Sequence, residues 1–394
     1  MFRPLAAILV VAVVSACGVR PEPARAAFET QATSAWLYDV ETDTVLFEKN
    51  AHEPIPPASM SKLMTLYMLF EALRDGRVTL DTTFSVSTRA RQMGGSTMFL
   101  DETDRPRVED LIKGIVVQSG NDACVVVAEG LAGTEDAFAR QMNARAPEIG
   151  MRDSTFTNAS GWPDPNHRMS ARDLGHLAYL MITEFPEYYG YFALEEFDFD
   201  GRSPSNRFNR NPVLGLGLGA DGLKTGHTEE AGYGLVGSAR QGNRRIIFVF
   251  AGLNSQAERR QEAEAFINWG FRQFIEKRMA SAGDVLGEMP VWMGNHQSIN
   301  LTVTEDLNVL VPAVGQDSVQ TRIEYRTPLD ATRGTVAEGE KVAELVIIAP
   351  DMPEKRIPLV SDREVLKGGF IPRVRASASV LFDKAMGQVQ SLME

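Results

Sequence analysis

Three short stretches of the sequence carry residue types that could together catalyse acyl transfer. The first is Ser59-Met60-Ser61-Lys62, an S-x-x-K pattern that places a hydroxyl and an amine one helical turn apart on the same face. Lys62 lies in a run of Leu, Met, Phe and Tyr, and burial lowers the affinity of an amine for its proton. A lysine on a helix is usually at the surface, but this apolar run favours a buried base. Prolines 56 and 57 place the start of the helix near Ser59, so its free N–H groups would face an oxyanion.

The other two stretches supply polar groups of complementary types. Ser119-Gly120-Asn121 interrupts an apolar helical segment and offers a hydroxyl and a carboxamide. Lys224-Thr225-Gly226 precedes a strand and offers a cation, a hydroxyl and a glycine that permits close backbone approach. Each stretch alone also has an ordinary explanation, as a helix break or as a lysine at a strand edge. Their combination in this order along the chain is what indicates a single site.

S-x-x-K, S-x-N and K-T-G in this order are the three elements of the penicillin-recognising serine enzymes. The segments 57–65, 114–123 and 221–234 resemble the low-molecular-mass penicillin-binding proteins of the D-alanyl-D-alanine carboxypeptidase family, and the resemblance covers most of residues 27–375. One departure from the family is the glycine-rich run 214–219 before Lys224. The resemblance implies an α/β (α+β) transpeptidase-like domain, with an antiparallel sheet flanked by helices, and a small all-β C-terminal domain.

The resemblance also implies a reaction, which is the removal of the terminal D-alanine from peptidoglycan stem pentapeptides. Ser59 would attack the carbonyl between the two D-alanines, Lys62 would take its proton, and Ser119 would help to pass that proton to the departing amine. The product of this step would be an acyl-enzyme on Ser59, which water then hydrolyses. No metal ion or other cofactor is implied, and β-lactam antibiotics would act as inhibitors by acylating Ser59.

Four further residues would bind the substrate by the same resemblance. Asn121 would hold the peptide, and Lys224 and Thr225 would bind its terminal carboxylate. The backbone N–H groups of His227 and Ser59 would form the oxyanion hole.

Arg210 and Arg260 are weaker candidates for anchoring the stem peptide, because surface ion pairs would explain them equally well.

Three alternative functions share the motifs. A D,D-endopeptidase would use the same chemistry on cross-links. A class A β-lactamase would need a glutamate in an E-x-x-x-N pattern, and Glu184, Glu187, Glu195 and Glu196 have no Asn four residues later. A non-catalytic sensor of peptidoglycan or β-lactams is disfavoured by the intact motifs.

The hydrophobic periodicity places these motifs in an order of elements. We expect hairpins over residues 35–48 and 232–253, a buried helix over 59–74, a broken helical stretch over 107–131, a helix over 170–183 and a closing helix over 262–278. The domain comprising residues 27–276 would therefore carry the site. After a linker near 279–290, recurring strand patterns predict a β-sandwich over 285–376. Residues 377–394 could form an amphipathic tail helix that binds a membrane surface or packs on protein.

The N-terminus has the pattern of an export signal, since Arg3 precedes the apolar run 5–14. Cleavage after residue 26 at an A-x-A site and a lipoprotein leader ending at residue 16, which would put lipid on Cys17, remain open alternatives. Both predict an exported, periplasmic protein that could be attached to the inner membrane. The second cysteine, Cys124, lies in an apolar run and is predicted to be a core residue.

Two classes of function are disfavoured by composition. The formal net charge of −12 disfavours nucleic acid as a partner, because phosphate contacts require clustered Lys and Arg. The five histidines form no H-x-x-x-H pair, so the sequence predicts no metal site.

Overall fold

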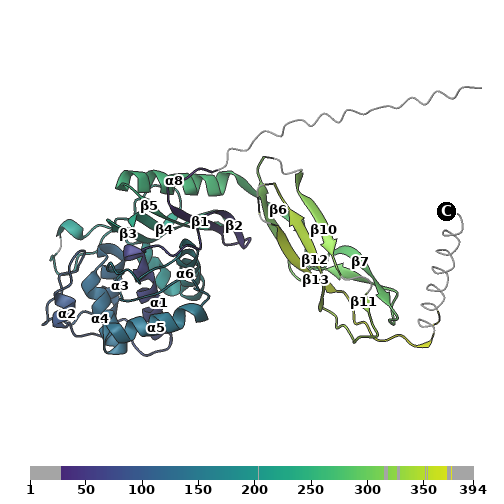
Figure 1. The fold of residues 1–394 in the computed structure, drawn as a ribbon, viewed down its shortest axis with the longest axis horizontal. Helices are drawn as coiled ribbons and strands as arrows, with labels where there is room; N and C mark the ends of the chain where they lie inside the picture. Colours follow the sequence, from purple (N-terminus) through teal and green to yellow (C-terminus); the bar gives the residue numbers. More distant parts are fainter. Residues whose placement is uncertain are drawn as a thin grey trace, which may run out of the picture. The chain divides into compact units, whose positions relative to one another are not determined.

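The structure is a computed structural model, and it describes residues 28–202, 204–314, 318–325, 329–350, 352, 354–370 and 374. A five-stranded antiparallel sheet forms the centre of the first domain, in the order β2-β1-β5-β4-β3 (Figure 1). Its strands are β1 Ser34–Asp39, β2 Thr44–Lys49, β3 Ala220–Thr228, β4 Gly232–Gln241 and β5 Arg244–Leu253. Both predicted hairpins are therefore confirmed. Strand β3, which carries the K-T-G motif, lies at one end of this order.

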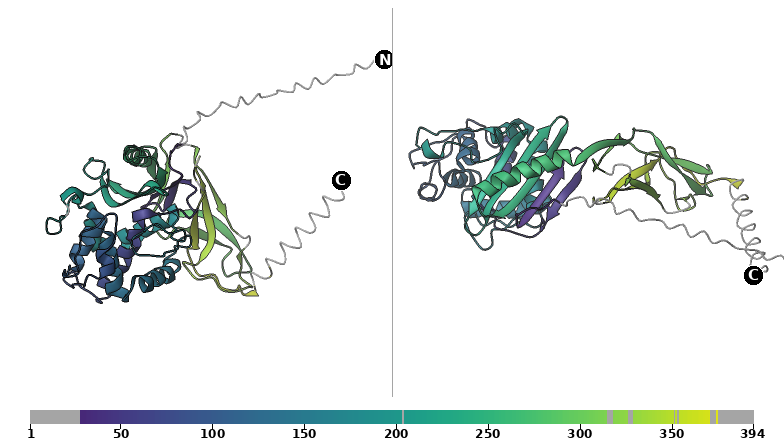
Figure 2. Two further views of the ribbon diagram at one scale, coloured as in Figure 1. Left: turned by 60° about the vertical axis from the view of Figure 1, so that its left-hand side comes forward. Right: turned by 90° about the horizontal axis from the view of Figure 1, so that it is seen from above.

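Helices cover both faces of the sheet, with α8 on one face and the remaining long helices on the other (Figures 1 and 2). The alternation of β5 explains this arrangement, because Ile247 and Val249 are buried in the cluster with the helical layer while Phe248 and Phe250 contact Phe266 of α8. The helical layer contains α1 Lys62–Arg74, α3 Val108–Lys113, α4 Asn121–Ala132, α5 Glu135–Glu148 and α6 Ala171–Glu184. Shorter elements are α2 Thr88–Arg91, α7 Pro186–Tyr189, η3 Gly190–Ala193 and η4 Pro204–Asn206.

The predicted buried helix is present as α1, nearly all of whose side chains lie in the core. It begins at Lys62 rather than at Ser59, and Ser59 lies in the preceding 3₁₀ turn η1 Ala58–Ser61. The predicted break in the second helical stretch is also confirmed. Helix α3 continues as a π-helical turn, η2 Gly114–Gln118, and Ser119 then adopts left-handed backbone angles of φ 59° and ψ 37° before α4 starts.

The closing helix differs from the prediction at both ends. Helix α8 runs over Gln256–Arg272, and Ser255 is its N-cap residue. The Ser255 side chain accepts a hydrogen bond from the N–H of Glu258. The residues that follow form β6 Phe274–Ala280, which pairs with β9 Leu307–Pro312. The prediction of helix through residue 278 was wrong, because this non-local pairing overrides the helical propensity of the Glu276–Arg278 stretch.

The C-terminal domain is all-β, as expected. Two sheets of described strands, β10-β12-β13-β8-β7-β11 and β6-β9, contribute to one apolar core. The remaining strands are β7 Val285–Trp292, β8 Ser298–Thr302, β10 Gln320–Glu324, β11 Leu329–Asp330, β12 Lys341–Ile348 and β13 Lys355–Ser361. The linker predicted near 279–290 is instead the end of β6, a turn and most of β7.

The predicted leader, Cys17 and the predicted tail helix lie outside the described residues. Within the described ranges, no helix combines the length and the apolar character needed to cross a membrane.

Candidate active site

Ser59 and Lys62 lie side by side where η1 meets α1. The Nζ atom of Lys62 donates hydrogen bonds to Ser59 Oγ at 2.9 Å and to the carbonyl oxygen of Ser160 at 2.6 Å. Lys62 has no exposed surface. Its burial, together with the nearby charge of Arg210, lowers the pKa of Lys62 to about 8. At pH 7 roughly one molecule in ten would then carry a neutral amine, which is able to accept the proton of Ser59.

Ser119 and Asn121 are positioned by the break between η2 and α4. The Oγ atom of Ser119 is buried, and it has no hydrogen-bond partner among the described residues. Such a hydroxyl is free to accept a proton on one side and donate one on the other. The Nδ2 atom of Asn121 donates to the carbonyl of Gly94 at 2.8 Å, and its backbone N–H donates to the carbonyl of Ser96 at 2.8 Å. Asn121 therefore holds the loop that carries Ser96.

The K-T-G motif faces η1 from strand β3. A Cβ atom on Gly226 would lie 2.9 Å from the carbonyl oxygen of Pro57, so the glycine is required for the close approach of β3 to η1. Gly226 also lines the cavity, so close approach of a ligand to its backbone stays a prediction. Lys224 is buried, and its Nζ donates to the carbonyl of Thr225 at 3.2 Å. Burial, with the charges of Arg210 and Lys62, places the pKa of Lys224 well below its usual range.

These groups surround one cavity of about 190 Å³. Ser59, Ser119, Thr225 and His227 line it, as the sequence predicted for a single site. Its other lining residues are Ser96, Arg210, Gly226, Tyr233, Gln256 and Arg259. The lysines reach the site indirectly, since Lys62 is bonded to Ser59 and Lys224 precedes Thr225 in β3. Asn121 is not among the lining residues, so its direct contact with substrate stays a prediction.

Of the two weaker candidates, Arg210 lines the cavity and Arg260 does not. Arg210 donates to Ser96 Oγ at 2.9 Å and to the carbonyl of Gln118 at 3.1 Å. Arg260 is exposed and pairs with Glu264 one turn along α8. The neighbouring residue, Arg259, takes the place in the cavity that had been considered for Arg260.

Arg259 and Tyr233 are the main functional candidates that the sequence analysis missed. Arg259 is 5 % exposed, and its guanidinium lies 5.5 Å from the ring centre of Tyr233. Its Nη2 donates to the carbonyl of Arg210 at 3.3 Å, and its buried Nε has no partner among the described residues. Tyr233 also stacks on His227, with ring centres 3.9 Å apart. The capping box at Ser255 and Glu258 was the signal that could have placed Arg259 on the first turns of α8.

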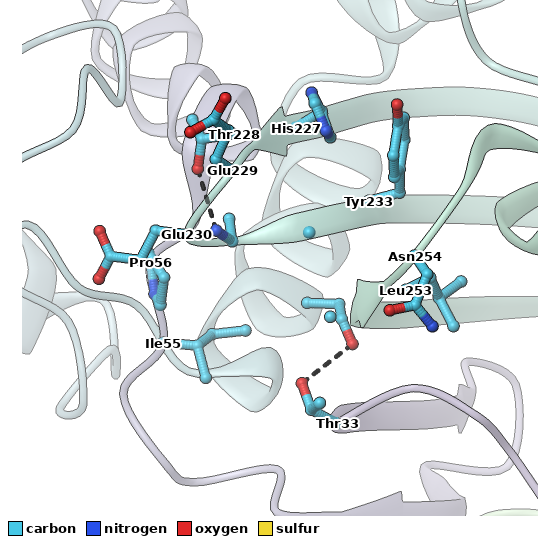
Figure 3. A pocket seen from close by; sticks show the side chains of 14 residues that line it. Thr33, Ile55, Pro56, His227, Thr228, Glu229, Glu230, Tyr233, Leu253 and Asn254 are labelled. Atoms are coloured by element: carbon cyan, nitrogen blue, oxygen red, sulfur yellow. Dashed lines mark hydrogen bonds between the residues drawn. The ribbon is translucent and has the colours of Figure 1, made fainter.

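A second hollow, whose lining includes His227 and Tyr233, lies beside the cavity (Figure 3). Its volume is about 400 Å³, and it shares these two residues with the cavity. Its rim includes Glu229 and Glu230 from the turn between β3 and β4. The site therefore has buried cations around Ser59 and a wider, partly acidic hollow beside it.

The chain is similar to known proteins over most of its length. Residues 20–255 match the family described as D-alanyl-D-alanine carboxypeptidase, and residues 274–367 match the C-terminal domain of penicillin-binding protein 5. The chain is 31% identical over 349 residues to the D-alanyl-D-alanine carboxypeptidase DacF of Bacillus subtilis, with 86% of this chain and 87% of the relative covered.

Two solved structures show the same architecture. Penicillin-binding protein 5 from Haemophilus influenzae is similar with a TM-score of 0.75 and 30% identity, covering 86% of this chain and 99% of that one. Penicillin-binding protein D2 from Listeria monocytogenes, in its ampicillin-bound form, is similar with a TM-score of 0.57 and 28% identity, covering 63% of this chain and 100% of that one. From the matched domains, the shared fold and the convergence of the three motifs, the chain belongs to the D-alanyl-D-alanine carboxypeptidase family of low-molecular-mass penicillin-binding proteins.

Proposed function

We propose that Ser59 is the acyl-ester nucleophile of this D-alanyl-D-alanine carboxypeptidase and that Lys62 is its base. The observation that carries the proposal is the 2.9 Å hydrogen bond from a fully buried Lys62 to Ser59 Oγ. Because burial lowers the pKa of Lys62 to about 8, the amine can take the proton as Ser59 attacks.

The reaction then follows from the neighbours of this pair. Ser59 Oγ forms a bond to the carbonyl carbon of the penultimate D-alanine, and its proton passes to Lys62. The C–N bond to the last D-alanine breaks, and Ser119 conducts a proton from Lys62 to the departing amine. Its unpartnered Oγ in the same cavity supports this role. Water subsequently hydrolyses the ester and restores Ser59.

The cations around the cavity favour a substrate with a free C-terminal carboxylate. Thr225, Arg210 and Arg259 line the cavity, and Lys224, whose Nζ donates to the carbonyl of Thr225, precedes it in β3. A carboxylate in contact with these groups would gain charge-assisted hydrogen bonds. We assign this role chiefly to the two arginines, because guanidinium groups match carboxylate geometry.

The natural substrate in this proposal is the stem pentapeptide of peptidoglycan. The hollow beside His227 and Tyr233 would receive the part of the peptide that precedes the scissile bond, since it adjoins the cavity (Figure 3). β-Lactams would acylate Ser59, and the ampicillin-bound structure of the Listeria relative supports this expectation.

Mass spectrometry after treatment with penicillin tests the nucleophile. We expect one covalent adduct on the peptide that contains Ser59, none in Ser59→Ala, and release of D-alanine from diacetyl-Lys-D-Ala-D-Ala by the wild type only. Ser61→Ala is the matched control within the motif, because its Oγ faces His167 Nε2 at 2.7 Å and does not line the cavity. An adduct that survives in Ser59→Ala would refute the assignment.

We also propose that the protein is exported and acts in the periplasm, attached to the inner membrane through lipid on Cys17 or through residues 377–394. The positive charge and apolar run at residues 3–14 support export. Cell fractionation with N-terminal sequencing tests it, and the full-length unmodified protein in the cytosol would contradict it. In that experiment Cys17→Ala separates the two anchors, because it abolishes only attachment through lipid.

A further inference from the structure

The loop Thr157–Trp162, here called the clamp loop, holds the start of α1 through its backbone. The carbonyl of Ser160 accepts the hydrogen bond from Lys62 Nζ at 2.6 Å. The carbonyl of Ala159 accepts a hydrogen bond from Thr65 Oγ1, one turn further along α1, at 2.6 Å. Two consecutive carbonyls of the clamp loop thus contact the helix that carries the proposed base.

The clamp loop also touches η1, and its own shape is fixed by one side chain. A Cβ atom on Gly161 would lie 1.9 Å from the carbonyl oxygen of Ala58, so only glycine permits this contact. Asn158 Oδ1 accepts hydrogen bonds from three successive N–H groups, those of Ser160, Gly161 and Trp162, at 3.1, 2.8 and 3.0 Å. These bonds shape the loop locally but do not connect it to the rest of the domain.

Glu135 provides that connection. It is the first residue of α5, is only 3 % exposed, and accepts a hydrogen bond from the N–H of Ala159 at 3.0 Å through Oε1. Its Oε2 accepts from Nε of Arg89 at 2.9 Å. Ala159 is fully buried, so its N–H loses its hydrogen-bond partner if the carboxylate is removed.

We propose that Glu135 is a positioning residue for Lys62, because it fixes the clamp loop whose carbonyl at Ser160 orients the Lys62 amine and whose packing keeps water from it. The inference rests on the proposed role of Lys62 as the base. Glu135 itself touches neither substrate nor the reacting atoms. The hydrogen-bonded route from Glu135 to Lys62 runs through the backbone of Ala159 and Ser160.

The charged and titratable groups around Lys62 come from several other elements. Asp122 and Cys124 face it from α4, Lys224 from β3, Arg210 from the segment before β3, and His167 from the segment after the clamp loop. None of these groups is itself replaced in a Glu135 variant, but removing the charge of Glu135 also acts on Cys124. The comparison of an alanine with a glutamine variant, which lose the same charge, therefore isolates the effect of the clamp loop.

The experiment compares Glu135→Ala with Glu135→Gln by following acylation by penicillin as a function of pH. Both variants lose the negative charge, but only glutamine keeps an acceptor oxygen for Ala159 N–H. We expect the alanine variant to acylate about ten- to hundredfold more slowly at pH 7, in line with the cost of a buried donor left unpaired. The acidic limb of the pH–rate profile of the alanine variant should also move to higher pH, because water that reaches Lys62 raises the pKa of the amine towards the ordinary value.

Glu135→Gln should keep the acidic limb of the pH–rate profile at the wild-type pH and should keep most of the wild-type acylation rate. Glu148→Ala is the matched control, since Glu148 lies at the other end of α5 and pairs with Arg145 at the surface. If the alanine variant does not fold, Glu135→Met takes its place, because it fills a similar volume without an acceptor. An unshifted limb in the variants without an acceptor, or an equal loss in the glutamine variant, would overturn the inference. Failure of the wild type to acylate would instead refute the proposed function.

Discussion

The assignment of Arg259 to the substrate carboxylate makes a prediction that can be measured as an interaction energy. Arg259 is almost fully buried, and burial, with the charge of Arg210 nearby, lowers its pKa to about 10. A buried guanidinium with an unpartnered Nε is therefore poised to donate to an anion. Hydrogen bonds to charged groups contribute about 1.5–3 kcal/mol. Arg259→Ala should thus lower kcat/KM for diacetyl-Lys-D-Ala-D-Ala by about ten- to hundredfold.

The same substrate with a C-terminal amide isolates the carboxylate interaction. The wild type should hydrolyse the amide poorly, and Arg259→Ala should lower kcat/KM for it by less than about threefold, so the two changes are strongly non-additive. Arg260→Ala is the matched control, because Arg260 is the next residue of α8 and pairs with Glu264 at the surface. An equal loss on the acid and the amide substrates would refute the reasoning, since it would show that Arg259 acts through the structure of the site and not through the carboxylate.

Three further predictions concern the base, the proton relay and the fold. Acylation of the wild type by penicillin should rise with pH and reach half of its maximum near pH 8, because Lys62 must be neutral and its pKa is about 8; a flat profile between pH 6 and 9 would contradict this. Ser119→Ala should lower kcat by about a hundredfold or more, the usual contribution of a positioned proton donor, and stopped-flow measurements that show an unchanged rate would remove Ser119 from the pathway. Asp39→Ala should lower the free energy of unfolding of the first domain by about 3–5 kcal/mol, because Arg244 then loses the buried carboxylate that lies 2.8 Å from its guanidinium. Thermal melts measure this loss against Glu41→Ala, a control at a more exposed neighbouring residue.

The site was largely predictable because its parts are encoded locally. Ser59 and Lys62 are three residues apart, and the break at Ser119 is marked by the Ser-Gly-Asn sequence between apolar segments. The convergence of β3 on η1 was inferred only from the resemblance. No local pattern places Gly226 against Pro57, because that contact joins segments from opposite parts of the domain.

The features that the sequence did not predict depend on contacts between distant segments or on the position of one helix start. The predicted helix began at residue 262, whereas α8 begins at residue 256. The prediction therefore left Arg259 outside the helix and could not assign the Arg259 side chain to the cavity. The strand β6 was predicted as helix because its Glu-Lys-Arg stretch favours a helix in isolation, whereas the pairing with β9 decides its structure. The hydrogen bond from Lys62 to the carbonyl of Ser160 could not be predicted, because every residue has a backbone carbonyl and the sequence does not indicate which one accepts.

The burial of Lys62 and Lys224 beside the cavity has a consequence for the stability of the enzyme without substrate. Each lysine has a pKa below its ordinary value, so the unfolded chain binds protons that the folded chain gives up. For Lys62, folding becomes more favourable as pH rises from about 8 towards 10.5, and at neutral pH the full penalty is present. The two lysines thus lower the stability of the protein without substrate. A substrate carboxylate bound near Lys224 would offset part of this penalty and so stabilise the folded domain.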